Sequence, residues 1–155
     1  MKHTYSAVTL ASLFALTSVF IGWQVVNSKQ LPTLLRLESP YTLSETINNI
    51  KNAVKARNFR MIREQPVAQG FLSGDNKQQH IVYFCNFTEA YQSLQQDKQI
   101  GYMLPCRFTI SEEGGKVIIS TINPAAITRL TGAKAGAVCA ANSAGYLDIM
   151  EEAVL

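Results

Sequence analysis

Hydrophobic and polar positions divide the chain into one long apolar stretch and a region of shorter, periodic patterns. No charged side chain occurs in residues 5–26, "YSAVTLASLFALTSVFIGWQVV". An α-helix of about 20 apolar residues crosses a hydrocarbon core of about 30 Å, so we expect a transmembrane anchor at residues 7–26. Residues 1–6 then form a short leader, which Lys2 keeps in the cytoplasm by the positive-inside tendency.

A cleaved signal peptide is the alternative to a retained anchor. Its apolar segment is usually only about 7–15 residues long and is followed by small residues at the cleavage site. Here the segment ends in the bulky "IGWQVVNSKQ", and Trp23 suits a membrane interface. We therefore expect an uncleaved signal-anchor, a polar linker at residues 27–33 and an exported domain at residues 34–155.

The exported region opens with a predicted strand and a predicted helix. "LLRLES" at residues 34–39 alternates apolar and polar side chains, which is typical of a half-buried strand. In the following "YTLSETINNIKNAVKARN", Thr42 and Glu45 have the spacing of a capping box, which starts a helix. The apolar face of this helix consists of residues at helical spacing: Leu43, Ile47, Ile50 and Val54.

Four further strands are predicted. The first, within residues 59–71, contains Pro66, which suggests an edge strand or a bulge. "HIVYFC" at residues 80–85 is the second. "YMLPCRFTIS" at residues 102–111 and "KVIISTIN" at residues 116–123, separated by "EEGG", are the two strands of a β-hairpin.

Three further helices complete the pattern. Asn86 and Glu89 are in a capping arrangement that starts a short helix ending near Leu94. Asn123 with the following proline starts another helical turn, and residues 133–155 form a C-terminal helix. Strands and helices do not alternate regularly, so the chain is predicted to be an α+β protein whose antiparallel sheet carries helices on one face.

Two motifs of the exported region are similar to those of a known family. The segment "FCNFTEAYQSLQQDKQIGYMLPCRFTI", followed by "GKVIISTINP", resembles the domain-of-unknown-function 302 family (DUF302), in the branch with Cys-Asn-Phe and Leu-Pro-Cys elements. The resemblance covers about residues 34–155. It implies a TATA-binding-protein-like arrangement, β-α-β4-α, in an exported bacterial protein, and it implies no established activity.

Composition argues against one class of partner. The 155 residues carry a net charge of +3, from 14 basic and 11 acidic side chains without a block of like charges. A surface that follows nucleic-acid phosphates usually has clustered Lys and Arg, so we do not expect a nucleic-acid partner. The expected partners are the bilayer, through the N-terminal helix, and another membrane protein or complex.

Two cysteines end and begin neighbouring predicted strands. Cys85 closes one strand and Cys106 opens the next. An exported location permits a disulfide between them, whereas free cysteines are often buried as small apolar side chains. A functional pair that binds metal or haem, or that does redox chemistry, is the third interpretation, and the sequence leaves all three open.

The remaining candidate residues for such chemistry have weaker support. Cys139 on the C-terminal helix would have no partner if Cys85 and Cys106 paired. If all three cysteines lay close together, their thiolates would suit a soft metal. No C-x-x-C spacing favours that site, so the metal stays unknown. His80 and Cys85 are an odd number of residues apart on one strand and point to opposite faces, which argues against a Cys-His nucleophile.

Aromatic residues gather around the two cysteines in the sequence. Most aromatic side chains in strands belong to the core, and the alternative is a ligand pocket or partner surface with polar anchors. The residues of that predicted surface are Phe84, Asn86, Phe87, Tyr91, Tyr102 and Arg107.

Two functions follow from these observations. The first is an accessory or binding module anchored in the bacterial inner membrane with its domain in the periplasm, such as a small subunit of a respiratory complex. The second is a thiol-based redox or metal/haem protein that uses Cys85 and Cys106. No catalytic residue and no cofactor can be named, and an enzyme is the less favoured interpretation because no nucleophile-base pair is present.

Overall fold

The computed structural model describes residues 31–67, 79–132, 134 and 136–155, with the backbone alone for residues 136–140. The expected leader, the membrane anchor and residues 27–30 of the linker lie outside the described residues. Within the described ranges, no helix has both the length and the apolar character needed to cross a bilayer.

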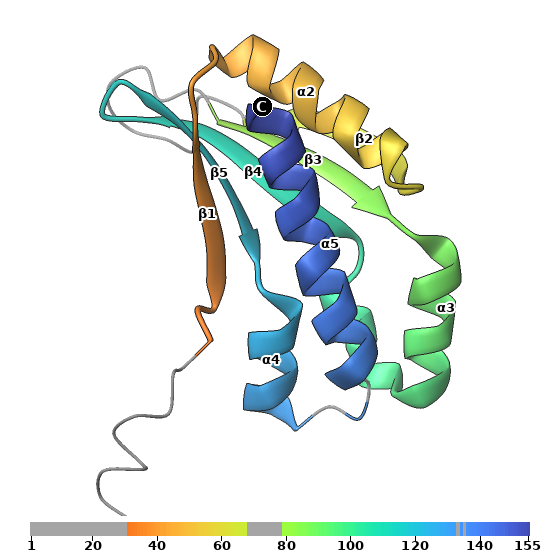
Figure 1. The fold of residues 1–155 in the computed structure, drawn as a ribbon. Helices are drawn as coiled ribbons and strands as arrows, with labels where there is room; N and C mark the ends of the chain where they lie inside the picture. The colour runs from red at the N-terminus through yellow and green to blue at the C-terminus, as the bar shows by residue number, and fades with distance from the viewer. Residues whose placement is uncertain (1–30, 68–78, 133, 135) are drawn as a thin grey trace, which may run out of the picture. The chain divides into compact units, whose positions relative to one another are not determined.

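Five antiparallel strands form one sheet in the order β1-β5-β4-β3-β2 (Figure 1). The strands are β1 (Leu34–Ser39), β2 (Arg60–Pro66), β3 (Gln79–Cys85), β4 (Cys106–Glu113) and β5 (Lys116–Ile122). The helices are α2 (Leu43–Ala56), α3 (Phe87–Gln96), the 3-10 helix η2 (Lys98–Met103), α4 (Pro124–Thr131) and α5 (Gly136–Val154). The α+β class and the antiparallel sheet are confirmed.

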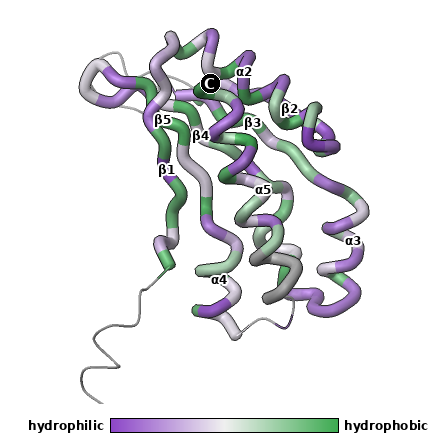
Figure 2. Tube along the Cα trace, viewed as in Figure 1, coloured by the Kyte–Doolittle hydropathy of each residue, from purple (hydrophilic) through white to green (hydrophobic). Residues whose placement is uncertain are grey.

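Two helices, α2 and α5, lie side by side on one face of the sheet (Figure 1). The strands send alternate apolar side chains to that face, and Figure 2 shows apolar positions along the strands while α3 is mostly hydrophilic. The strand positions in the core include Val82, Phe84, Phe108, Ile110 and Ile119. They pack against apolar residues of the two helices, which include Ile50, Val54, Tyr146, Ile149 and Met150.

Four aromatic rings pack against one another, three of them in this core and the partly buried Phe59 against it. Phe84 of β3 stacks on Phe108 of β4, with ring centroids 4.6 Å apart and an interplanar angle of 11°. The Tyr146 ring of α5 meets Phe84 edge-on at 5.2 Å, and Phe59 meets Phe84 in the same way at 5.5 Å. Edge-to-face and offset-stacked pairs add stability beyond the area they bury, so the rings join the sheet to α5.

Side-chain caps set where the helices begin. The capping box at α2 is confirmed: Glu45 N–H donates to Thr42 Oγ1 at 3.4 Å, and Thr42 N–H donates to Glu45 Oε2 at 3.0 Å. The hydrogen bond from Thr42 lowers the pKa of Glu45. Asn86 caps α3, and Asn123 caps α4 ahead of Pro124, both as predicted from the sequence.

Some predicted boundaries are wrong. Residues 102 and 103 belong to η2 and not to a strand, and β4 begins only at Cys106, after a proline that has no N–H for a strand ladder. β4 also extends to Glu113, so the hairpin turn contains only Gly114 and Gly115, at φ of 60° and 79°. Positive φ at both turn positions suits the right-handed twist of the two strands and favours glycine.

The edge position of Pro66 is confirmed. It ends β2, which is the last strand of the sheet order, and the register of β2 shifts between Met61 and Arg63. The C-terminal helix begins at Gly136, three residues later than predicted. The helices α3 and α4 and the 3-10 helix η2 lie beyond one end of the strands and extend the predicted β-α-β4-α order (Figure 1).

Truncation of Phe84 tests the aromatic core. Phe84 is fully buried, and Phe84→Ala should lower the free energy of unfolding by about 3–5 kcal/mol, because a large cavity replaces the ring. Phe87 is three residues away and 57% exposed, so Phe87→Ala should change this free energy by no more than about 0.5 kcal/mol. Urea unfolding followed by circular dichroism measures both, and equal losses would contradict the assignment of Phe84 to the core.

Candidate functional site

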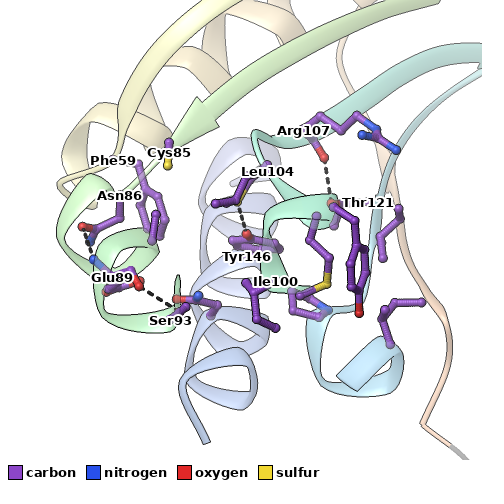
Figure 3. A pocket seen from close by; sticks show the side chains of 18 residues that line it. Phe59, Cys85, Asn86, Glu89, Ser93, Ile100, Leu104, Arg107, Thr121 and Tyr146 are labelled. Carbon is purple, nitrogen blue, oxygen red and sulfur yellow. Dashed lines mark hydrogen bonds between the residues drawn. The ribbon is translucent and has the colours of Figure 1, made fainter. Parts of the chain in front are cut away.

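A cavity of about 230 Å³ lies at the end of the sheet where α3, η2 and α4 gather (Figure 3). It exists because the chain leaves β3 at Cys85, passes through α3 and η2, and returns to the sheet only at Cys106. Asn142 and Tyr146, from the first three turns of α5, form a further wall. The apolar lining residues are Phe59, Ala90, Ile100, Met103, Leu104, Ile122, Pro124 and Ile127.

Hydrogen bonds within the α3 wall hold its polar side chains in place. Asn86 Oδ1 accepts from the N–H of Glu89 at 3.3 Å, which caps the helix. The buried Ser93 donates from Oγ to the carbonyl oxygen of Glu89 at 2.8 Å, so its hydroxyl is satisfied within the helix (Figure 3). Asp97 caps η2 by accepting from Gln99 N–H at 2.9 Å.

Further hydrogen bonds fix the wall formed by α4. Buried Asn123 accepts from Ser143 Oγ of α5 at 2.8 Å and donates from Nδ2 to the carbonyl oxygen of Pro32 at 2.8 Å. The Tyr102 hydroxyl lies 3.1 Å from Thr131 Oγ1. These bonds join η2, α4, α5 and the start of the domain, so the chain enters the domain at the same end as the cavity.

The two cysteines lie in the cavity lining as free thiols. Cys85 ends β3 and Cys106 begins β4, as predicted from the sequence. Both side chains are free thiols, so the structure contains no disulfide between them, and the disulfide interpretation of the sequence is not borne out.

Burial keeps both thiols protonated at neutral pH. It raises the pKa of Cys85 to about 11, with smaller contributions from Cys106 and from the Glu89 carboxylate. Burial also raises the pKa of Cys106, although a hydrogen bond from the Tyr146 hydroxyl to Cys106 Sγ at 2.6 Å acts in the opposite direction. The thiolate is the form that attacks disulfides and binds metals, so the raised pKa values disfavour both activities.

Other groups do not complete a metal or nucleophile site. Among the described side chains, no three His, Cys, Asp or Glu residues are placed to hold a metal ion. The side chain of Cys139 lies outside the described residues, so the predicted three-thiolate site stays a prediction. His80 lies near the start of β3, with Nδ1 3.4 Å from Glu64 Oε1, at the opposite end of the strand from Cys85.

The structure brings together only part of the predicted ligand or partner surface. Asn86, Tyr102 and Arg107 line the cavity. Arg107 contributes through its backbone, whose oxygen accepts from Thr121 Oγ1 at 2.7 Å, and its guanidinium is directed away (Figure 3). Phe84 belongs to the aromatic core.

Two predicted aromatic residues lie outside the cavity, and some of its residues had no sequence signal. Phe87 and Tyr91 are 57% and 66% exposed and do not line it. Glu89 was identified only as part of a helix start, and Asn142 and Tyr146 of α5 reach the cavity only through tertiary packing.

The fold of this chain is similar to that of proteins without an assigned function. A family model described as "Domain of unknown function DUF302" matches residues 35–152. The crystal structure of an uncharacterized conserved protein DUF302 from Bacillus stearothermophilus has a TM-score of 0.73 at 18% sequence identity, over 79% of this chain and 98% of that chain. No curated protein matches this chain. At this sequence identity the likeness shows the fold alone.

The pKa of Cys85 predicts a loss of stability at high pH. Between pH 9.0, the usual value for the thiol, and about 11, its value in the fold, the unfolded chain loses this proton while the folded chain keeps it. The stabilising contribution is therefore complete below pH 9.0 and is lost as the pH rises toward 11. Urea unfolding at several pH values should show a steeper decline for the wild type than for Cys85→Ala, and parallel curves would contradict the raised pKa.

Proposed function

The chain belongs to the DUF302 family of unknown function, and on that premise we propose that it is a membrane-anchored periplasmic binding module. Its ligand is a small and largely apolar molecule held in the cavity at the end of the sheet. The observation that carries this proposal is the cavity itself, because a concave apolar site with a few polar groups is the usual form of a small-molecule site.

The chemistry of the lining favours binding over catalysis. Apolar side chains from η2, β5 and α4 would remove apolar ligand surface from water, which is favourable by about 25 cal/mol per Å². The thiols of Cys85 and Cys106 are protonated at neutral pH, and among the described side chains no imidazole lines the cavity to activate them. The redox or metal/haem function is therefore the less favoured alternative.

The location at the inner membrane is supported by the sequence. Residues 7–26 are long and apolar enough for an anchor, and the linker at residues 27–33 is too short to let the domain move far from the bilayer. Pro32 is bound to Asn123 beside α4, so the linker joins the domain at its cavity end. Tethering close to the bilayer suits the proposed accessory role beside a larger membrane protein.

Filling the cavity tests the binding function. Ala90 of α3 lines the cavity, and Ala90→Phe should abolish ligand retention because the ring takes the space of the ligand. Gln92 lies on the same helix, is exposed and is absent from the lining, so Gln92→Phe should still retain the ligand.

The full-length proteins would be purified from native membranes in a mild non-ionic detergent and denatured. Mass spectrometry of the released small molecules should find a compound common to the wild type and Gln92→Phe that is depleted at least about tenfold in Ala90→Phe. The same small-molecule profile in all three samples would count against the cavity as a binding site, provided that circular dichroism shows Ala90→Phe to be folded.

The anchor and the accessory role are tested on the full chain in its own membrane. The wild type should stay in the membrane after an alkaline wash, whereas Leu16→Arg should be released in part. An arginine at the centre of a spanning helix costs about 2.5–3.5 kcal/mol. In mild detergent the wild type should migrate in native electrophoresis with a larger assembly. Migration alone at its own mass would contradict the accessory role, and release of the wild type by the wash would contradict the anchor.

A further inference from the structure

We propose that the ligand of this cavity is an organic cation, with its apolar groups against the cavity walls and its charge opposite Glu89. This inference rests on the proposed binding function and names the class of ligand. It starts from the charged residues of the lining, which among the described residues are Glu89 and Arg107. The Arg107 guanidinium is directed away from the cavity (Figure 3), which leaves Glu89 as the other charged residue of the lining.

The position of Glu89 agrees with this role. Its charge raises the pKa of both Cys85 and Cys106, whereas the charge of Arg107 lowers the pKa of Cys106 alone, so Glu89 is the group within electrostatic reach of both thiols. Within the part of the chain that the structure describes, no Lys, Arg or His forms an ion pair with it. A partly buried carboxylate in an apolar surrounding is stabilised by a bound opposite charge, because water screens it less there than at the surface.

Aromatic rings in the lining of the same cavity favour an alkylated or aromatic cation. Phe59, Tyr102 and Tyr146 all line the cavity, and the rings of Phe59 and Tyr146 lie 6.3 Å apart at an angle of 66°. The face of such a ring attracts a cation, and groups of rings are a known means of recognising quaternary ammonium ions. The apolar walls bury the alkyl groups of such an ion, which a small inorganic cation does not have.

An anion and a metal ion fit this cavity less well. The N-terminus of α3 carries the positive end of a helix dipole, but Glu89 lies in the first turn and already places a negative charge there. A second anion would meet that carboxylate at short range in an apolar surrounding. A metal ion needs several ligands, and the described side chains offer no group of three.

The experiment compares three probes of similar shape on the full chain in a non-ionic detergent. Isothermal titration calorimetry would measure the binding of benzyltrimethylammonium, of the neutral benzyl tert-butyl ether and of the anionic phenylacetate. The cation should bind the wild type more tightly than either analogue. Glu89→Gln should lower the affinity for the cation by about tenfold or more and should change the affinity for the neutral analogue by no more than about twofold. The matched control is Glu151→Gln, because Glu151 is exposed on α5 and does not line the cavity.

The outcomes separate the two proposals. If the neutral analogue binds as tightly as the cation, or Glu89→Gln binds the cation as the wild type does, the cation inference is overturned and the binding function stands. If phenylacetate binds most tightly, the inference is also overturned, in favour of an anion site. If none of the three probes binds the wild type at millimolar concentration, the inference fails together with the binding function. Loss of cation binding in Glu151→Gln would assign the effect to net charge and not to the cavity.

Discussion

The stack of Phe84 on Phe108, closed at its edge by Tyr146, is the contact on which the rest of this structure depends. It joins the neighbouring strands β3 and β4 to α5, and Tyr146 also reaches the cavity and donates a hydrogen bond to Cys106. The same residue therefore belongs to the core and to the site. The cavity therefore shares Tyr146 with the aromatic core, while another of its walls is built from the shorter segments α3 and η2.

The chemistry of the site follows from its place at the boundary of the core. Burial near the sheet keeps both cysteine thiols protonated, so residues that suggest redox or metal chemistry in the sequence act in the fold as part of an apolar lining. Glu89 is placed differently, since it belongs to the first turn of α3 and is only partly buried. A cavity that contains a carboxylate, neutral thiols and aromatic rings is a setting for binding a positive group, and it is a poor setting for generating a nucleophile.

Much of the fold could be predicted because its signals are local. The capping box of Thr42 and Glu45, the cap residues Asn86 and Asn123, and the alternation in β1 all depend on residues within a few positions of each other. The start of β4 was harder to predict from the sequence. Apolar residues at positions 102 to 104 continue a strand-like pattern, and only packing of the connection beyond the sheet places them in and after η2.

The candidate site shows the same division. The sequence by itself determined that Cys85 and Cys106 end and begin strands, and that Asn86 and Glu89 start a helix, because each of these depends on local hydrogen bonding and periodicity. Only the tertiary structure decided that Phe84 is core while Tyr102 lines a cavity, and that Arg107 faces away from it. It also brought in Tyr146 from a helix 40 residues beyond Cys106. The register of strands and the packing of distant helices set these directions, and both are properties of contacts between segments far apart in the chain.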